Sequence, residues 1–379
     1  MKLLQLNASY KPAYIYGGPT MSVSKLSEEL ARAGCETEVF TTTANGTTEL
    51  PVIPGEAARI DGVKVTYFKR ITKDHTHYSP ALLRKLRKEV RNFDLVHIHA
   101  WWNLVSVLSC RIALKHGVPV IVSPRGTLSG YSFSNKNSLA KRLIHALLGK
   151  KLLNASYIHV TSEREREAME KLTGTKKIFN IPNFIAFPAG IPVEGITQSD
   201  HLRLIFLSRI EEKKGLEILF EALSDIHIPY RLTIAGDGDT AYINNLKKFA
   251  EELGLTNNID WIGFKNDNKF DILQQHDLFV LPSYDENFGN AVIESLSTGT
   301  AVLISNNVGL ATYIEQKKFG WVCNQDALSF REKITSIAEQ QDELLRIRKE
   351  APGIIRNDFS ERALVKKYIE MYKEVIANG

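Results

Sequence analysis

The stretch FVLPSYDENFGNAVIESL, Phe279 to Leu296, joins a strand-like apolar run to a helix-like one and carries two acids, Glu286 and Glu294. We expect a buried strand to end at Pro282 and a helix to begin near Gly289. The first turn of a helix has unpaired N–H groups and the positive end of the helix dipole, which suits an anion. In a plainer interpretation, Glu286 caps the helix and Glu294 is a solvated residue on its polar face.

The same strand-to-helix alternation extends along most of the chain, which is typical of a doubly wound α/β fold. The strand-like runs are KLLQLNA, ETEVFTT, GVKVTYF, DLVHIH, VPVIVS, YIHVT, LRLIFLS, YRLTIAG, NIDWIG, DLFVLP and AVLIS. The periodicity stops at residues 181–200, IPNFIAFPAGIPVEGITQSD, where Pro, Gly and polar residues collect, so we place a linker there.

We therefore expect two Rossmann-like domains, residues 1–185 and 200–359, and an amphipathic helix at residues 360–379 that returns to the first domain. The length of 379 residues supports two domains, because single cores stop growing well below that size. Parallel sheets of this kind bind ligands at the carboxyl ends of their strands, so two facing sheets would form a central cleft.

The composition is that of a globular protein, with 44% hydrophobic and 24% charged residues. No apolar run is long enough to span a bilayer, and the start, MKLLQLNA, resembles a first strand more than a signal peptide, so we expect a cytoplasmic protein. The three cysteines, Cys35, Cys110 and Cys323, lack the spacing of metal ligands.

Positive charge is concentrated in the first half, where residues 1–190 hold 27 Lys and Arg against 14 Asp and Glu. A basic half suits nucleic acid, anionic lipid or phosphorylated ligands, but no nucleic-acid-binding motif accompanies it, so we expect no nucleic acid. Basic runs at residues 82–92 and 135–155 favour peripheral association with an anionic membrane surface, on the inner face of the cell membrane. Ordinary core packing would also account for the apolar positions of the second run.

A second candidate phosphate site lies in FLSRIEEKKGLEILFEAL, residues 206–223. Arg209 comes at the end of a strand and Lys214 just before a helix, and two cations beside a helix start suit a diphosphate. The alternative is a solvated charge run, which would fit Lys213 as well as Lys214.

The first half offers weaker signals. Gly17 and Gly18 follow the first strand and precede a helix, so their amides would approach a phosphate or simply form a turn. In DLVHIHAWW, His97 and His99 point to the same side of a strand, and His99, at its end, is the better candidate for the cleft. Either histidine would also fit a structural role.

The literal Asp-x-Asp of GDGD, Asp237 and Asp239, is a possible cation site that we set aside. The pair follows a strand and precedes a helix, so turn and capping roles explain both carboxylates. With Arg209 and Lys214 available to neutralise a diphosphate, we expect no metal and no cofactor.

These motifs, taken in order, resemble the second domain of retaining glycosyltransferases of family 4, which have a GT-B fold and a Glu-x7-Glu motif. The motifs that carry the likeness are Ser-Arg, Lys-Gly, AGDGD, LPSYDENFGNAVIES and NVG. The likeness is strong from Leu204 to about Gly320 and looser in the first half, where YGGPTMSV, DLVHIHAWW, VSPRGTL, VTSERE and IPNF match.

The resemblance implies a role for each matched residue of the second domain. Arg209 and Lys214 would bind the diphosphate of a nucleotide sugar and stabilise it as a leaving group. Glu294 would hold the ribose hydroxyls. Glu286 would hold the donor sugar and phosphates, together with the backbone of Phe288, Gly289, Asn290 and Ala291.

In the first domain, we expect the amides of Gly17 and Gly18 to approach the donor phosphate or the reacting sugar, and we count His99 with Arg209, Lys214 and Glu286 as the candidate catalytic residues. Many relatives carry a catalytic-site histidine after the next strand, where this chain has VSPRGTLS with Arg125. That pattern is similar to a subset found in bacterial polysaccharide assembly. Arg125 would take over a contact to sugar or phosphate.

The resemblance implies a retaining transferase that moves a sugar from a nucleoside diphosphate sugar, of UDP- or GDP-hexose type, to a glycan or a lipid-linked saccharide in cell-surface polysaccharide synthesis. The leaving phosphate would accept the proton of the acceptor, so no carboxylate nucleophile is needed. The alternatives are another GT-B enzyme, such as a nucleotide-sugar epimerase or a phosphorylase, and a non-catalytic nucleotide-sugar-binding subunit.

Overall fold

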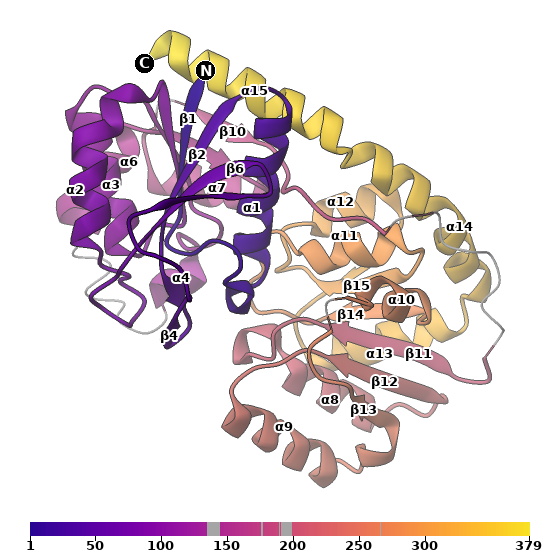
Figure 1. Ribbon diagram of the computed structural model, residues 1–379. Helices are drawn as coiled ribbons and strands as arrows, with labels where there is room; N and C mark the ends of the chain where they lie inside the picture. The colour runs from indigo at the N-terminus through magenta and orange to yellow at the C-terminus, as the bar shows by residue number, and fades with distance from the viewer. Residues whose placement is uncertain (135–144, 176, 189, 191–198, 266) are drawn as a thin grey trace. The chain divides into compact units, whose positions relative to one another are not determined.

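The computed structural model describes residues 1–134, 145–175, 177–188, 190, 199–265 and 267–379. It contains two compact units (Figure 1). Unit 1 consists of Met1–Phe184 and Glu361–Gly379, and unit 2 of Ile185–Ser360. Each unit is an α/β layered structure around a mainly parallel sheet, so the fold class expected from the sequence is confirmed.

The sheet of unit 1 has eight strands in the order β10-β9-β8-β7-β1-β2-β6-β5, and within it only β5 is antiparallel to its neighbour. Its strands are β1 (Lys2–Leu6), β2 (Glu36–Thr42), β5 (Ala57–Ile60), β6 (Val63–Phe68), β7 (Leu95–His99), β8 (Val120–Ser123), β9 (Tyr157–Val160) and β10 (Ile178–Asn180). A separate hairpin pairs β3 (Ala44–Asn45) with β4 (Thr48–Glu49).

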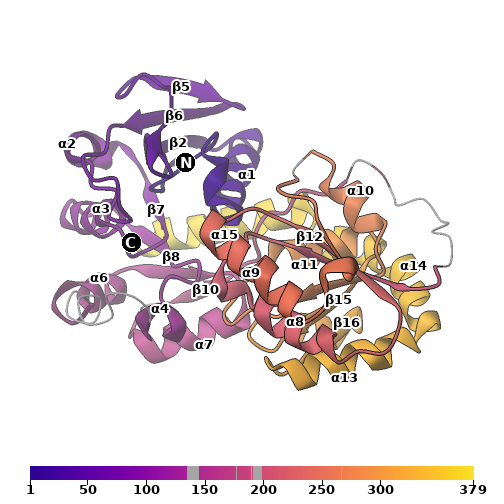
Figure 2. The same ribbon diagram turned by 90° about the horizontal axis from the view of Figure 1, so that it is seen from below.

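Helices cover both faces of this sheet (Figure 2). They are α1 (Gly18–Arg32), α2 (Pro80–Glu89), α3 (Leu104–Lys115), α4 (Gly130–Ser134), α6 (Lys150–Asn154), α7 (Glu163–Leu172) and α15 (Glu361–Asn378), with short turns η1 (Tyr14–Tyr16), η2 (Val90–Asn92) and η3 (His145–Gly149). Side-chain caps define where several of these helices begin. The side chains of Ser79 and Asn103, for example, accept hydrogen bonds from backbone N–H groups in the first turns of α2 and α3.

The two faces of the unit 1 sheet follow from the alternation of side chains along its strands. Leu4 of β1 and Val96 of β7 pack in one core with residues of α2, α3 and α6. Leu3 and Leu95, one position earlier in each strand, pack in another core with residues of α1 and α15. The C-terminal helix is therefore part of unit 1 and covers the face to which odd-numbered residues of β1 and β7 point.

Unit 2 has a six-stranded parallel sheet in the order β13-β12-β11-β14-β15-β16. Its strands are β11 (Leu202–Leu207), β12 (Tyr230–Ala235), β13 (Ile259–Trp261), β14 (Leu278–Leu281), β15 (Ala301–Ser305) and β16 (Gly320–Cys323). Its helices are α8 (Leu216–Ser224), α9 (Thr240–Glu252), α10 (Lys269–Gln274), α11 (Asn290–Ser297), α12 (Ala311–Lys317), α13 (Ala327–Ala338) and α14 (Gln341–Asp358), with short turns η4 (Glu212–Lys214) and η5 (Thr256–Asn258).

In unit 2, α8 packs against α13 and α11 packs against α14. Because crossovers between parallel strands are right-handed, α8, which leads from β11 to β12, and α11, which leads the opposite way from β14 to β15, belong to opposite faces. Across the described ranges of the chain, no helix combines the length and apolar character that crossing a membrane requires.

Candidate functional site

The predicted cations and acids of unit 2 meet where the strand order reverses. β11 and β14 are neighbours, but the chain leaves β11 toward β12 and leaves β14 toward β15. The loops after these two strands, residues 208–215 and 282–289, therefore diverge from adjacent strand ends. Such a switch point is the usual ligand-binding crevice of an open α/β sheet.

Lys214 and Glu286 form an ion pair between Nζ and Oε2, and Lys214 is buried. The two loops are also joined through their backbones, because Tyr284 N donates to Lys213 O at 2.9 Å. Burial would raise the pKa of Glu286, but Lys214, followed by Lys213 and Arg209, outweighs it and holds that pKa below its ordinary value. The carboxylate is thus charged at neutral pH.

Gly215 permits this close approach of the two loops. It has a φ of 70°, and a Cβ at this position would collide with the carbonyl oxygen of Pro282. The two neighbouring lysines of this loop have different partners. Lys214 binds Glu286, whereas Lys213 binds Asp285 at 3.1 Å.

Arg209 lies in the same loop, with its side chain half exposed and paired with Glu211 at 2.7 Å. It is not in contact with Glu286, although its charge still contributes to the lowered pKa of that acid. Arg209 and Lys214 therefore supply one exposed and one buried cation at the switch point.

Helix α11 begins at Asn290 after Gly289, whose φ of 96° lies in the left-handed region. The N-cap residue is Gly289, and the Glu286 carboxylate accepts from Lys214 rather than from a backbone N–H of this helix, so the interpretation of Glu286 as a cap is wrong. Phe288 is buried and packs edge-on against Phe359, with ring centroids 6.2 Å apart, so only its backbone is available to a ligand. The first turn of α11 thus begins beside the Lys214–Glu286 pair, as an anion site requires.

Glu294 lies on α11 and binds Lys269 Nζ at 2.7 Å. Only 12% of its side chain is exposed, so it is not the solvated residue of the plainer interpretation. A largely buried, paired carboxylate on the helix that starts at the anion site is suited to accept hydrogen bonds from hydroxyl groups.

Unit 1 has its own switch point, between β1 and β7. Gly17 is the N-cap of α1, with a φ of 64°, and Gly18 is the first residue of that helix. His99 ends β7 and is fully buried, with Gln5 Oε1 2.7 Å from its Nε2 and Arg125 Nε 3.2 Å from its Nδ1. Neither ring nitrogen of His99 is free to bind a ligand. This environment fits the structural role that the sequence analysis left open for the residue.

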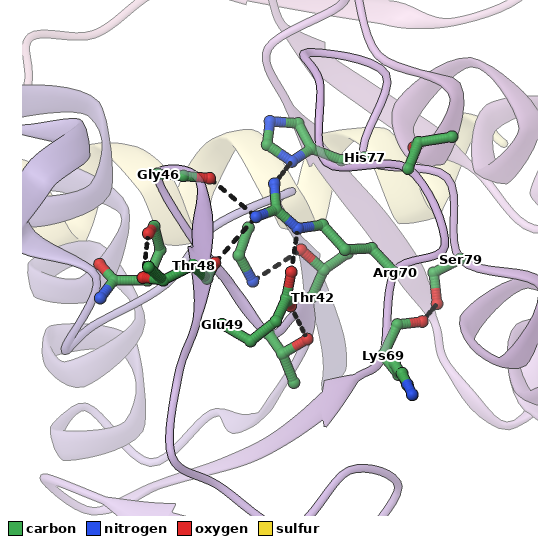
Figure 3. Close-up of polar contacts among 12 residues, drawn as sticks. Thr42, Gly46, Thr48, Glu49, Lys69, Arg70, His77 and Ser79 are labelled. Atoms are coloured by element: carbon green, nitrogen blue, oxygen red, sulfur yellow. Dashed lines mark hydrogen bonds and ion pairs between the residues drawn. The ribbon is translucent and has the colours of Figure 1, made fainter.

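A buried arginine, which no sequence motif indicates, supports the loop before Gly17. Arg70 has a fully buried side chain, and its Nε donates to Glu49 at 2.7 Å (Figure 3). Its Nη2 donates to the carbonyls of Gly46 and Thr48 at 2.7 and 2.9 Å, and its Nη1 lies 3.2 Å from His77 Nδ1. Arg70 thereby fixes the β3–β4 hairpin.

This hairpin in turn contacts η1, since Gly46 N donates to Tyr16 Oη at 3.0 Å. The Tyr16 ring also meets the His77 ring edge-on, with centroids 5.9 Å apart. Tyr16 directly precedes Gly17, so the hairpin held by Arg70 supports the glycine pair. No sequence motif indicates this support, because the partners of Arg70 lie on separate loops.

Asp237 and Asp239 have local roles. Asp239 caps α9 by accepting from Tyr242 N at 3.0 Å, and Asp237 accepts from Gly238 N at 2.8 Å. The described residues contain no group of three or more His, Cys, Asp or Glu arranged to hold a metal ion.

Two family models match the chain, one to each part of it. The model described as "Glycosyl transferases group 1" matches residues 194–353, and "Glycosyl transferase 4-like domain" matches residues 17–183. The chain is a GT-B glycosyltransferase of family 4. Between them the two models include all the residues that form the two switch points except the first strand and the loop that follows it.

Individual relatives agree with this family. An uncharacterized glycosyltransferase of Methanocaldococcus jannaschii is 26% identical over 361 residues, 87% of each chain. The lipopolysaccharide core biosynthesis glycosyltransferase LpsE of Rhizobium meliloti is 26% identical over 211 residues, 55% of this chain and 58% of the relative. The structure of Anabaena HepE in complex with UDP and glucose matches with a TM-score of 0.75 and 19% identity, over 99% of this glycosyltransferase and 100% of that chain.

Proposed function

We propose that this glycosyltransferase moves a sugar, with retention at the anomeric carbon, from a nucleoside diphosphate hexose to a glycan or a lipid-linked saccharide in cell-surface polysaccharide synthesis. The observation that carries the proposal is the unit 2 switch point. There Arg209 and Lys214, each paired with a carboxylate, lie with the start of α11 at one strand edge. The relatives named for lipopolysaccharide core synthesis and for a complex with UDP and glucose support it.

In this proposal, each unit 2 residue has a separate task. The diphosphate binds Arg209, Lys214 and the backbone of Gly289, Asn290 and Ala291. Glu294 accepts hydrogen bonds from the ribose hydroxyls, and Glu286 from the hydroxyls of the sugar. Because Glu286 is charged and held by Lys214, it acts as a binding residue and not as a nucleophile.

The reaction then proceeds on one face of the sugar. The bond from the anomeric carbon to the leaving phosphate oxygen breaks as the acceptor oxygen bonds to the same carbon from the same side. The acceptor's proton passes to the leaving phosphate. Arg209 and Lys214 stabilise the charge that develops on the diphosphate, which is where fixed cations accelerate such a step most.

In unit 1, we propose that Gly17 and Gly18 approach the donor through their backbone and that Arg125 contacts sugar or phosphate. His99 supports Arg125 in this scheme and does not itself touch the substrate, because it is fully buried and both its ring nitrogens are bonded. Trp101 is fully buried as well, so it is not placed to stack on a sugar.

We also propose that no metal ion takes part, since two cations already face the diphosphate. Activity should be unchanged in excess EDTA, and Asp237→Asn should retain wild-type turnover. Loss of activity in EDTA that a divalent ion restores would contradict this. It would also reopen the role of the Asp-x-Asp sequence.

The experiment that tests the donor is a thermal-shift screen of UDP, GDP, ADP, CDP and dTDP. One nucleotide should raise the melting temperature, because a ligand at a hundred times its dissociation constant stabilises by about 2.7 kcal/mol. The matching nucleotide sugars are then assayed for hydrolysis and for transfer. Binding without turnover of any sugar would favour a non-catalytic subunit, and conversion of the donor sugar to its epimer would favour an epimerase.

A further inference from the structure

Arg125 is held in an unusual conformation with part of its guanidinium free. It follows β8, and its φ of 53° lies in the left-handed region, which residues other than glycine rarely adopt. Its Nη1 donates to Ser22 Oγ at 3.0 Å and to Asn183 Oδ1 at 2.8 Å. Within the described part of the chain, no acceptor meets Nη2 and no carboxylate pairs with the guanidinium. Arg125 therefore keeps a charge and two N–H groups for a ligand.

The third donor of Arg125, its Nε, starts a chain of hydrogen bonds whose direction can be worked out. A guanidinium only donates, so His99 Nδ1 is the acceptor at 3.2 Å and the proton of the ring is on Nε2. That Nε2–H donates to Gln5 Oε1 at 2.7 Å. The amide nitrogen of Gln5 donates in turn to Tyr372 Oη at 3.2 Å.

From Tyr372 the chain continues in the same direction. The tyrosine hydroxyl donates to His97 Nδ1 at 2.8 Å, which leaves the proton of that ring on Nε2. His97 Nε2–H donates to Ser123 Oγ at 2.6 Å, and Ser123 donates to His159 Nδ1 at 2.6 Å. His159 Nε2–H ends the chain on the carbonyl oxygen of Ile181, at 2.9 Å.

The alternation of the strands explains why these polar groups meet. Gln5, His97, His99, Ser123 and His159 occupy positions that point to the face of the sheet covered by α15. They stand at or near the carboxyl ends of four neighbouring strands, β1, β7, β8 and β9. Tyr372 is the residue that the C-terminal helix contributes to the chain, and it is fully buried.

The three histidines of this chain of hydrogen bonds, His97, His99 and His159, must all be neutral, with the proton on Nε2. An added proton would turn one Nδ1 into a donor facing another donor and break the chain there. Burial agrees with this requirement, since it lowers the pKa of His159 to about 3 and those of His97 and His99 well below their ordinary value.

We propose that Tyr372 is a positioning residue for glycosyl transfer, whose hydroxyl orients His99 through Gln5 and so holds the guanidinium of Arg125 with Nη2 directed to the substrate. The role of Tyr372 in glycosyl transfer rests on the proposed function, whereas the chain of hydrogen bonds does not. Without the hydroxyl, the Gln5 amide loses its acceptor and is free to rotate. A rotated amide would present a donor to His99 Nε2 and reverse its tautomer, which would place a proton against Arg125 Nε.

The test uses the full-length enzyme and the variant Tyr372→Phe, which removes one oxygen and keeps the ring. The matched control is Tyr368→Phe on the same helix, a buried tyrosine whose hydroxyl donates to Pro182 O and lies 3.2 Å from Nε2 of His159, at the end of the chain farthest from Arg125. Two measurements are made on each protein. The first is the ring 15N spectrum of histidine-labelled protein, which distinguishes the two neutral tautomers. The second is kcat and KM for the nucleotide sugar.

We expect the wild type to show three neutral Nε2–H rings. In Tyr372→Phe the signals of His97 and His99 should shift, and kcat should fall by about 10-fold or more while the melting temperature stays close to that of the control, since small misplacements of a positioned group are costly in rate. Tyr368→Phe should keep the wild-type kcat and the signal of His99.

Unchanged His97 and His99 signals in Tyr372→Phe would contradict the proposed chain of hydrogen bonds. Shifted signals with a kcat equal to that of Tyr368→Phe would overturn its role in transfer. The tautomer spectrum needs no substrate, so a wild type that turns over no nucleotide sugar would refute the proposed function, and with it the role of Tyr372, while the spectrum still reports on the chain.

Discussion

Lys214 and Glu286 form an ion pair although 72 residues of chain separate them. The pair exists because β11 and β14 are adjacent in the sheet while their following loops belong to different crossovers. It joins the cation nearest the proposed diphosphate to the acid nearest the proposed sugar. A change in either residue should therefore affect both binding and the orientation of the other.

Lys214→Ala should lower turnover by about 100-fold, the order expected when a group that stabilises transition-state charge is lost. The substitution also leaves Glu286 without its partner, so the double variant Lys214→Ala/Glu286→Gln separates the two effects. The double variant should regain melting temperature but not turnover. Arg231→Ala, which removes an exposed cation paired with Asp260, serves as the control and should behave as wild type in steady-state assays. Wild-type turnover in Lys214→Ala would remove this residue from the mechanism.

Gly289→Ala should weaken nucleotide binding. The φ of 96° disfavours any other residue by about 1–2 kcal/mol, and the new Cβ would lie 3.2 Å from side-chain carbons of Val292 and Val308. Relief of this strain would tilt the first turn of α11, so the thermal shift given by the nucleotide should shrink. The measurement compares that shift with the one in Gly254→Ala, whose φ is 72° but whose Cβ would meet nothing within 4 Å. Equal shifts in the two variants would contradict an anion site at α11.

The enzyme should lose stability as the pH falls below about 6.5. His97, His99 and His159 have folded-state pKa values below the ordinary one, and burial also lowers the pKa of His77 to about 4. The unfolded chain binds protons on these rings from about pH 6.5 downward, whereas the folded chain does not, so acid favours unfolding by roughly 1 kcal/mol per histidine for each pH unit.

Urea unfolding at about pH 7 and pH 5.5 measures this slope, which depends on the difference in bound protons. A midpoint that does not move over this range would show that these four rings are not buried in neutral form.

Binding to anionic vesicles should depend on α2. Arg84, Arg87 and Lys88 are exposed on this helix while its leucines face the core, and each charge near an anionic surface contributes about 1 kcal/mol. Changing all three to Gln should weaken co-sedimentation with anionic liposomes roughly 100-fold. Added salt should weaken wild-type binding as well.

The matched control for that test changes three exposed lysines of unit 2, Lys247, Lys248 and Lys349, to Gln. Two outcomes would point to a soluble acceptor. One is equal binding of the two triple variants to anionic vesicles, and the other is equal binding of the wild type to anionic and to neutral vesicles. Lys141 and Arg142, in the second basic run of the sequence, lie outside the described residues.

The fold could be predicted because apolar alternation and helix signals recur in nearly every crossover. The strands that sequence patterns did not indicate are β3, β4, β5, β10 and β16. All five are two to four residues long, and β10 and β16 are only partly buried. Such strands are held by pairing with a neighbour, and their own sequences contain too few residues to show a period.

The candidate site was predictable only where chemistry follows directly from the local motif, as at Gly289 and Glu286. The pairing of Lys213 with Asp285 and of Lys214 with Glu286 joins two loops that are distant in the sequence, so no local motif indicates it. The surroundings of Arg125 come from residues as distant as Gln5 and Tyr372, and neither of these lies in a recognisable motif.

The place of α15 in unit 1 has a consequence for biosynthesis. Unit 2 is one uninterrupted segment, Ile185–Ser360, and is translated in full before the ribosome reaches the helix that supplies Tyr372. Unit 1 is translated first but still lacks α15 at that moment. The histidines on the face of the sheet that α15 covers are then exposed to water. The nascent enzyme therefore assembles its second half before it can complete its first, and a stop codon a few dozen bases early would leave the first half without its cover.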